Sequence, residues 1–379
     1  MARFARRALV AAGALLLAAS CGSPPPSPAS FGPAERVTLD AAAEQLPGGG
    51  TVTDVSGDGR LVLFHASGDL VEGPDEANLA NAYLRDSLTG ELTWLRDPSL
   101  DPATQGVERT HLLSADASAA IAIGTGLDGT SGRGSYLFDV AASTWHLLGP
   151  AELGNQLDLS SDGRTVAGPA CCGDPGLSVY EVATGSWEQI HDAGSATLSP
   201  PKFVQDDTRL AFTVSTSVVR LWTIQLDGTD AAQVPADLGA VEPLNGWVTA
   251  AGDECVLVQT GHPVTGIDAL LVDVGTGGTT STVLRSYTRP SGTTTPIGAF
   301  RGTAVADDCR RVLGWDSARG SFALVDVTAG WIIEAFAPFA DEPATAVLSE
   351  DGRTVAATTS DALVGDDTNG VDDGYVRRR

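Results

Sequence analysis

Positive charge is scarce in this sequence. A single lysine, Lys202, and 22 arginines stand against 48 acidic residues, and the formal net charge is −25. Such a field repels nucleic-acid phosphates and anionic lipid headgroups. We therefore expect no nucleic-acid partner, and we expect any contact with a membrane to depend on an anchor.

Long apolar segments are also missing. The apolar run over residues 8–19 is too short to cross a bilayer, which takes about 20 residues. A basic stretch with Arg3, Arg6 and Arg7 precedes this run, so residues 1–20 have the form of a targeting segment that is not part of the fold. A plain secretory signal is the simplest interpretation.

The end of this segment suggests a more specific signal. Leu17-Ala18-Ala19-Ser20-Cys21 resembles the lipobox of bacterial lipoproteins, with Ala18 at a position where Leu is commonest. The resemblance implies that the Cys21 thiol carries a diacylglyceryl group. Gly, Ser and Pro are frequent in residues 21–34, which we interpret as a tether. We predict a lipid-anchored, extracytoplasmic protein of the bacterial cell envelope.

Familiar catalytic motifs are absent from the sequence. It has no G-x-S-x-G elbow, no C-x-x-C pair and no H-E-x-x-H or H-x-x-x-H spacing. Nucleophilic hydrolysis, thiol redox chemistry and zinc binding therefore have no support from motifs. The five histidines fall at unrelated places, namely His65, His111, His146, His191 and His262.

What the sequence does contain is a repeat. Residues 55–66, 159–170 and 348–359 read VSGDGRLVLFHA, LSSDGRTVAGPA and LSEDGRTVAATT, and weaker copies begin at residues 113, 203, 249 and 304. Each copy has two strand-like runs around an acidic turn, which is the signature of a β-hairpin. The turn aspartates are Asp58, Asp116, Asp162, Asp207, Asp253, Asp308 and Asp351.

A second strand pair recurs once per unit, as in residues 81–95, 134–148 and 177–190. Each unit therefore holds four antiparallel strands in about 45–50 residues, the size of one propeller blade. No segment shows sustained helical periodicity, and a sandwich or two barrels would not give near-equal periods. We predict an all-β fold, a seven-bladed β-propeller over residues 35–379.

The two ends of the chain are predicted to complete one blade. The C-terminal unit supplies only three strands, the last at residues 374–378. Residues 35–41, ERVTLDA, have the alternation of an outer blade strand. Pairing of these two segments would close the ring and remove an open sheet edge.

The repeat resembles that of the TolB-type propellers of bacteria. SGDGRLVLF (56–64) and SEDGRTVAA (349–357) are similar to the S-x-D-G-R core of that family, and residues 363–377 resemble a bacterial subgroup with D-T-N-G-x-x-D-x-[FY]-V-R-D. The resemblance covers residues 35–379 and implies a propeller. TolB itself carries an additional α/β domain that these residues do not supply, so no role in the Tol system is implied.

Four cysteines accompany Cys21, and an even number in an exported chain suggests disulfides. Cys255 and Cys309 fall in the acidic turns of neighbouring units, which favours a bond between them. Cys171 and Cys172 would then form an adjacent pair, as in a vicinal disulfide. Four cysteines allow three pairings, and the other two stay open.

The acidic segment 366–373, DDTNGVDD, raises the question of calcium. Asp367, Asn369 and Asp373 surround Gly370 as in half of a calcium loop. The alternative is that these side chains satisfy backbone groups in a tight turn. We favour the turn and expect no cofactor, with structural calcium as the alternative.

For function, the sequence favours a non-catalytic scaffold. We expect a monomeric propeller that presents a loop-built face to an envelope protein or a glycan. The alternative is an enzyme of the central channel, a metal-assisted lyase or lactonase, which would need several acids or histidines converging at the innermost strands. The acids recognised in the repeat lie mostly in turns, which favours the scaffold.

Overall fold

The structure, a computed structural model, describes residues 30–379 apart from 68–69, 71–79, 102–104, 131, 171–175, 217–218, 235–245, 263–265, 276–280, 284–285, 289–293, 297–299, 317–318, 337–338 and 340–344. The described part is almost entirely β, with one short 3₁₀ helix, η2 (Ala151–Gln156). None of its helices is long and apolar enough to span a membrane. Cys21, Cys171 and Cys172 lie outside the described residues.

The strands form groups in chain order, and they pair antiparallel apart from one parallel bridge between Thr288 and Trp331. One sheet joins two groups through the pair Ala80–Val107. Its first group is β2 (Thr51–Val55), β3 (Leu61–Ser67), β4 (Ala80–Asp86) and β5 (Leu92–Trp94), and its second is β6 (Gly106–Leu113), β7 (Ala119–Thr125), β8 (Arg133–Asp139) and β9 (Thr144–Pro150).

Two further sheets follow along the chain. One holds β10 (Asp158–Leu159), β11 (Thr165–Pro169), β12 (Gly176–Glu181) and β13 (Ser186–Asp192). The other holds β14 (Thr197–Leu198), β15 (Lys202–Val204), β16 (Arg209–Ser215), β17 (Val219–Gln225) and β18 (Ala232–Gln233).

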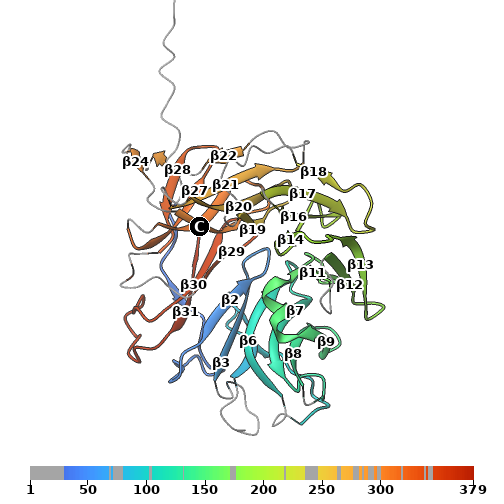
Figure 1. Ribbon diagram of the computed structural model, residues 1–379. Helices are drawn as coiled ribbons and strands as arrows, with labels where there is room; N and C mark the ends of the chain where they lie inside the picture. Colours follow the sequence, from blue (N-terminus) through green and yellow to red (C-terminus); the bar gives the residue numbers. More distant parts are fainter. Residues whose placement is uncertain are drawn as a thin grey trace, which may run out of the picture.

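The remaining sheets complete the described part. One contains β19 (Gly246–Ala251), β20 (Cys255–His262), β21 (Gly266–Asp273) and β22 (Ser281–Val283), and the next contains β23 (Ser286–Thr288), β24 (Thr294–Pro296), β25 (Phe300–Val305), β26 (Arg311–Asp316), β27 (Ser321–Asp326) and β28 (Trp331–Glu334). The last contains β1 (Glu35–Arg36), β31 (Asp373–Arg378), β30 (Thr354–Thr359) and β29 (Thr345–Leu348), in that order. Figure 1 shows the sheets arranged in chain order around a common centre.

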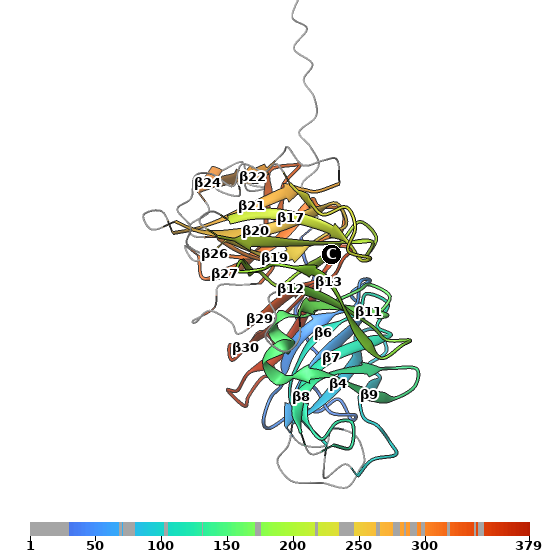
Figure 2. The ribbon, with the colours of Figure 1, turned by 45° about the vertical axis from the view of Figure 1, so that its right-hand side comes forward.

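The position of a strand within its sheet explains its composition. β7 (AAIAIGT) and β30 (TVAATT) lie in the middle of their sheets and are buried nearly throughout, because other sheets cover both of their faces. The outer strand β13 (SWEQIHD) is polar and largely exposed. The core is accordingly divided into clusters between neighbouring sheets. One of these packs Ile121 and Leu137 against Val166 and Tyr180, where both views place β7 and β8 beside β11 (Figures 1 and 2).

The acidic turns between paired strands have a shared structure. In the turn after β2, Asp58 Oδ1 accepts hydrogen bonds from Ser56 Oγ (2.7 Å) and from the Arg60 N–H (2.9 Å). The turns around Asp116, Asp162 and Asp351 repeat this pattern. Gly59 has a φ of 68°, and a Cβ there would lie 2.1 Å from Thr354 Oγ1, so glycine is required. These aspartates are turn formers.

The two ends of the described chain meet in what we call the terminal seam, residues 30–46 against 366–378. β1 pairs with β31 through Glu35–Val376 and Arg36–Tyr375, and the Val37 N–H continues the pairing to the Gly374 C=O (2.9 Å). The N-terminal strand is shorter than the predicted 35–41. It ends because Asp40 Oδ1 accepts hydrogen bonds from the Ala42 and Glu44 N–H groups, which turns the chain.

Candidate binding site in the central pocket

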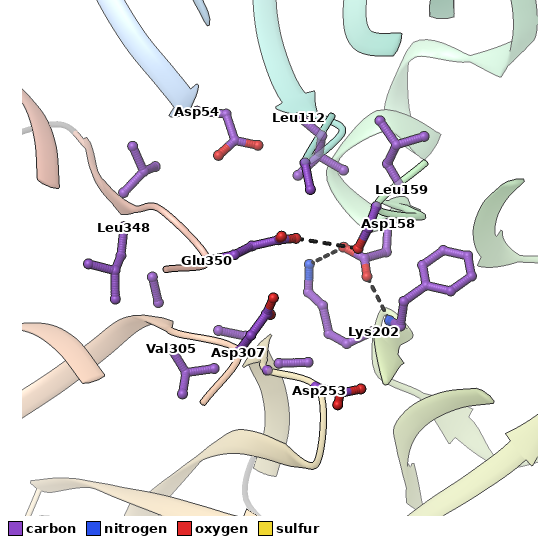
Figure 3. Close-up of a pocket in the computed structure, with 18 of the residues that line it drawn as sticks. Asp54, Leu112, Asp158, Leu159, Lys202, Asp253, Val305, Asp307, Leu348 and Glu350 are labelled. Carbon is purple, nitrogen blue, oxygen red and sulfur yellow. Dashed lines mark hydrogen bonds and ion pairs between the residues drawn. The ribbon is translucent and has the colours of Figure 1, made fainter. Parts of the chain in front are cut away.

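A cavity of about 580 Å³ lies where the sheets meet. Its wall contains residues of the innermost strands β2, β6, β10, β15, β19, β25 and β29, together with the turns that follow them. The volume falls within the range of small-ligand sites. Figure 3 shows Asp54, Glu350, Asp307 and Lys202 entering the cavity from different sheets.

Asp54 is fixed on the β2 side of the cavity. Its Oδ2 accepts a hydrogen bond from the Leu113 N–H of β6 (2.8 Å), and its Oδ1 accepts one from the Val55 N–H (2.9 Å). Enclosure in the channel disfavours the charged form and raises the pKa of Asp54 to about 7, although both hydrogen bonds oppose this shift. Asp54 is therefore a rigid carboxyl group that gains or loses its proton near neutral pH.

Lys202 and Asp158 form an ion pair in the wall opposite β2. Lys202 Nζ lies 2.7 Å from Asp158 Oδ1, and the Phe203 N–H donates to Asp158 Oδ2 (2.8 Å). Both side chains are less than one-fifth exposed. The one lysine of the chain is thus already neutralised by a partner that the backbone holds in place.

Hydrogen bonds link the acidic turns to one another around one end of the cavity. We call this set of turns, residues 56–59, 114–117, 160–163, 205–208, 252–255, 306–309 and 349–352, the turn ring. In five of these links a backbone N–H donates to a backbone C=O of the next turn: Gly57 to Ala115, Asp116 to Ser161, Asp253 to Asp307, Asp307 to Glu350 and Asp351 to Gly57. In the other two the acceptor is an aspartate side chain: the Ser161 N–H donates to Asp207 Oδ2, and the Asp206 N–H donates to Asp253 Oδ1. The chain of hydrogen bonds returns to its first turn.

Two predicted turn formers have a different role in this ring. Asp207 and Asp253 accept hydrogen bonds from neighbouring turns, from the Ser161 N–H and the Asp206 N–H respectively, both at 2.6 Å. Asp253 lies in the predicted turn between β19 and β20, but this turn is shorter than the first one, because the Gly252 N–H bonds the Cys255 C=O. Asp253 consequently occupies the position that Gly57 holds in the first turn.

Glu350 and Asp307 bring two carboxyl groups together at the turn ring. Burial and then the neighbouring Asp307 charge raise the pKa of Glu350 to about 8. Burial likewise raises the pKa of Asp307, and the pKa of Asp207 for the same reason. Ser161 Oγ donates to Glu350 Oε1 at 3.4 Å. Among the ion pairs of the described residues, none includes Glu350 or Asp307.

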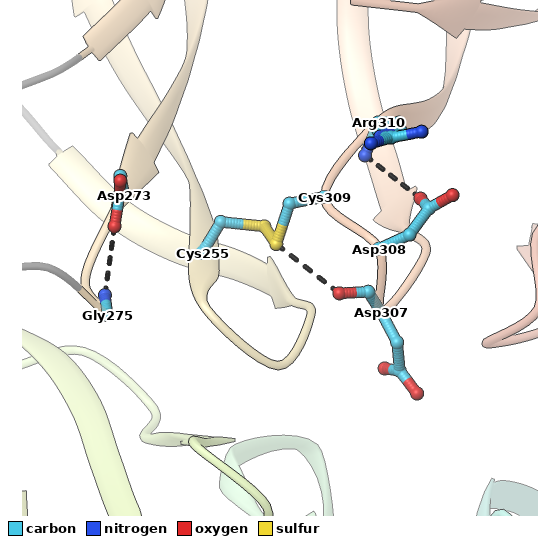
Figure 4. Close-up of a disulfide and its surroundings, with 7 residues drawn as sticks. All are labelled: Cys255, Asp273, Gly275, Asp307, Asp308, Cys309 and Arg310. Atoms are coloured by element: carbon cyan, nitrogen blue, oxygen red, sulfur yellow. Dashed lines mark hydrogen bonds between the residues drawn. A yellow bond between two sulfur atoms is a disulfide. The ribbon is translucent and has the colours of Figure 1, made fainter.

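A disulfide fastens the turn ring beside these two carboxyl groups. It joins Cys255, at the start of β20, to Cys309, in the turn after β25, with a Cα–Cα distance of 5.9 Å (Figure 4). These are the two cysteines that the sequence favours as a pair. The bond holds the hairpins β19–β20 and β25–β26 together.

The residues of the predicted calcium loop lie in the terminal seam, away from the cavity. Asp373 accepts from Thr38 Oγ1 (2.8 Å) and Gln45 Nε2 (3.1 Å), and Asp367 accepts from Gln45 Nε2 (2.9 Å) and from the Tyr375 hydroxyl. Asn369 Nδ2 donates to the Leu46 C=O (2.8 Å). In the described residues, no three His, Cys, Asp or Glu side chains are grouped to hold a metal ion.

Two of the histidines lie near the cavity wall without entering a cluster. Burial lowers the pKa of both His65 and His111 to about 4, so both are neutral at pH 7. His65 Nδ1 lies 3.2 Å from Thr110 Oγ1. His146 and His191 stand on the outer strands β9 and β13, and the side chain of His262 lies outside the described residues.

Sequence reasoning missed Asp54, Asp158 and the role of Lys202. A signal was present, because Asp54 and Asp158 both lie two residues before the serine of their turn. The corresponding residues of other repeats are apolar, namely Leu112, Phe203, Ala250, Ala304 and Val347. The acids at these otherwise apolar positions line the cavity.

The fold is that of known β-propellers. An oligogalacturonate lyase from Vibrio parahaemolyticus superimposes with a TM-score of 0.55 at 13% identity, over 92% of this chain and 97% of the other. An oligogalacturonate lyase in complex with manganese gives 0.55 at 16% identity, over 93% and 98%.

These likenesses extend to the fold alone. No family model matches the sequence. No characterised protein matches it at a significant level. The chain is thus an all-β protein of the propeller class with antiparallel four-stranded sheets, and its function has to be argued from its own central pocket.

Proposed function

We propose that residues 35–379 form a seven-bladed β-propeller, closed by pairing of β1 with β31, that binds a ligand in its central channel without transforming it. The observation that carries this proposal is the cavity, whose wall draws one strand from each sequence unit. Asp54 and the Lys202–Asp158 pair are fixed by backbone hydrogen bonds. A prearranged wall of this kind lowers the ordering cost of binding.

The ligand carries positive charge. The cavity is lined by six acids of the turn ring, Asp206, Asp207, Asp253, Asp307, Asp308 and Glu350, and the one lysine is neutralised by Asp158. A low-dielectric channel of one sign concentrates counter-ions of the other. A primary amine offers three N–H donors to such a wall. The ligand is therefore an amine-bearing group presented by an envelope protein or glycan, or a free polyamine.

The protein acts outside the cytoplasm, carried by a lipid on Cys21 and the tether 21–34. The lipobox-like segment and the Cys255–Cys309 bond support this location, because disulfides persist in oxidising compartments. Palmitate-analogue labelling tests the anchor. The full chain is labelled and Cys21→Ala is not; equal labelling of the two would refute lipidation.

Calorimetric titration of the mature domain tests the ligand class. We expect spermine to bind at low salt and to weaken as salt is added, because exposed charges are screened. Asp206→Asn, which removes a charge from the cavity wall, lowers the affinity several-fold. Glu254→Gln, an exposed acid outside the wall, leaves it unchanged. No spermine binding, or equal binding by the two variants, would contradict the proposal.

A central-channel enzyme is the second candidate. It is favoured by two carboxyl groups with raised pKa values on one cavity, Glu350 and Asp54, since a general acid or base works best with a pKa near the operating pH. Trigalacturonate is the discriminating probe, because a polyanion opposes the charge of this channel. Formation of an unsaturated product from it would favour the enzyme, and no turnover would favour the binding protein.

A further inference from the structure

The chain is fixed to the last sheet just before its first strand. Phe31 is buried in a cluster with Phe336 and Tyr375. Arg377 Nε donates to the Gly32 C=O (2.7 Å) and its Nη2 to the Phe31 C=O (3.2 Å). The same guanidinium lies 5.8 Å from the centre of the Phe31 ring. The predicted tether therefore joins the propeller at one defined point, Phe31.

The strand register places this point at the turn-ring end of the molecule. β30 begins at Thr354, directly after the last turn of the ring, and Thr354 pairs with Arg378 at the end of β31. The Gly32 N–H donates to the Arg378 C=O (2.7 Å), and the segment runs antiparallel to β31. Phe31 consequently lies beyond Arg378, so the tether and the turn ring share one end of the molecule.

The length of the tether limits how the molecule can sit on a membrane. Cys21 lies ten residues before Phe31, and a fully extended segment of this length reaches about 35 Å. A compact domain of the size of residues 35–379 is about 50 Å across. The tether is therefore too short to set the opposite end of the domain on the membrane. A lipid on Cys21 brings the turn-ring end to the lipid surface.

Two exposed arginines lie at this end of the last sheet, in a protein with a net charge of −25. They are Arg353, which follows the last turn, and Arg379, whose N–H donates to the Arg353 C=O (3.0 Å). We call them the exit arginines. Among the ion pairs of the described residues, none includes either of them. Guanidinium groups match the geometry of phosphate groups, which lipid headgroups present.

Exposed acids of the cavity wall are found at the same end. Asp206, Asp307 and Asp308 line the cavity and are exposed to solvent. Their charges oppose a lipid surface of net negative charge. A zwitterionic headgroup instead offers its phosphate to the exit arginines and its ammonium group to these acids. This end of the molecule therefore matches a zwitterionic phospholipid better than an anionic one.

We propose that the turn-ring end of the propeller faces the membrane that carries the protein, with Arg353 and Arg379 in contact with the phosphate groups of zwitterionic phospholipids. The proposal rests on the lipid anchor of the proposed function. It goes beyond that function because it gives the molecule a direction, which places the acids of the turn ring at the lipid surface.

Energy transfer to labelled lipids tests this orientation without the natural anchor. A histidine tag replaces residues 1–21 and holds the chain on phosphatidylcholine vesicles that contain a nickel-chelating lipid and an acceptor-labelled lipid. A donor dye is attached at Arg164→Cys, directly after the third turn of the ring, or at Arg220→Cys, at the opposite end of β17. Both arginines are exposed. The tagged chain with neither substitution gives the background from the other cysteines.

We expect the transfer from position 164 to be about two-fold greater than from position 220, because the two ends of a domain of this size are tens of ångströms apart. Equal transfer from the two positions, or greater transfer from position 220, overturns the proposal. Since the tag replaces Cys21, absence of palmitate labelling of the natural chain refutes the lipid anchor alone, whereas equal transfer in this experiment refutes the orientation alone.

Charge reversal tests the contact with lipid. In the chain labelled at position 164, at equal amounts of bound protein, Arg353→Glu together with Arg379→Glu should lower the transfer. The matched control reverses two exposed arginines of the opposite end, Arg133→Glu with Arg220→Glu, and should leave the transfer unchanged. An equal response of the two double variants refutes the contact by the exit arginines.

The class of lipid is tested in the same chain. Phosphatidylglycerol in place of part of the phosphatidylcholine should lower the transfer from position 164, because the turn-ring acids and a net negative surface repel each other. A rise in transfer would refute the zwitterionic class.

Discussion

Carboxylates crowd together in the terminal seam and at the turn ring, but they meet different partners. In the seam, Asp373 and Asp367 are almost fully buried beside the Arg36 guanidinium, at 3.7 Å from each. Thr38, Gln45 and Tyr375 donate hydrogen bonds to the same two carboxylates. At the turn ring, Glu350 accepts a hydrogen bond from Ser161 Oγ, and burial and the neighbouring Asp307 charge raise its pKa.

This difference separates the acids that join the chain ends from the acids that line the cavity. Buried carboxylates with a cation and several donors hold two chain segments together, because each charge has a partner. Burial and a neighbouring negative charge instead favour the protonated form of a carboxyl group, as they do at Glu350. The most acidic segment of the sequence, residues 366–373, therefore joins the two chain ends, whereas the acids that line the cavity are spread over separate turns.

The largest expected effect comes from removing the Arg36 guanidinium, which lies beside the buried carboxylates of Asp367 and Asp373. Arg36→Met leaves Asp367 and Asp373 buried without a positive partner, and it should lower the free energy of unfolding by about 3–5 kcal/mol. Urea denaturation measures this. The control is Arg378→Met in the same strand pair, whose partner Glu35 is more than half exposed; its cost is below about 1 kcal/mol. An equal loss of unfolding free energy in the two variants would contradict the distinction between the buried Arg36 pairs and the exposed Arg378–Glu35 pair.

A smaller effect is expected from the disulfide that fastens the turn ring. Cys255 and Cys309 are 54 residues apart. Replacing both by Ser should therefore cost about 2–4 kcal/mol, mainly through the greater freedom of the unfolded chain. The same change should increase hydrogen exchange at the Asp253 and Asp307 N–H groups and leave the seam amide of Val37 protected. An equal loss of protection at both places would mean that the two regions are not independent.

The smallest effect is expected from calcium. The oxygens of Asp367 and Asp373 already accept hydrogen bonds, and the Asn369 side chain is directed at the Leu46 C=O. Calcium or EDTA should leave the melting temperature unchanged. If calcium raises the melting temperature and Asp367→Ala abolishes this rise, the loop is a metal site. The carboxylates of the seam would then still be able to bind a cation in addition to their hydrogen-bond donors.

Local patterns predicted much of the fold. The Ser-x-Asp turns and the flanking apolar runs specify each hairpin from neighbouring residues, and the strands appear where the repeat places them. The length of β1 was overestimated because the Asp40 turn depends on two backbone N–H groups further along the chain. Asp54, Asp158 and Glu350 meet only when distant units face one cavity, so no local pattern groups them.

The central claim is that the carboxyl groups of the cavity hold protons near neutral pH. Glu350 and Asp54 have folded pKa values raised to about 8 and about 7, so the folded state binds more protons than the unfolded state and stability falls as pH rises through these values. The lowered pKa values of His65 and His111 oppose this only below about pH 6.5.

Thermal melting between about pH 6.5 and about pH 8.5 therefore isolates the acids. The account predicts that the melting temperature of the wild type falls across this range, that Glu350→Gln makes the fall shallower, and that Glu254→Gln does not. A wild-type melting temperature that stays level or rises, or a Glu350→Gln curve parallel to it, would contradict the account.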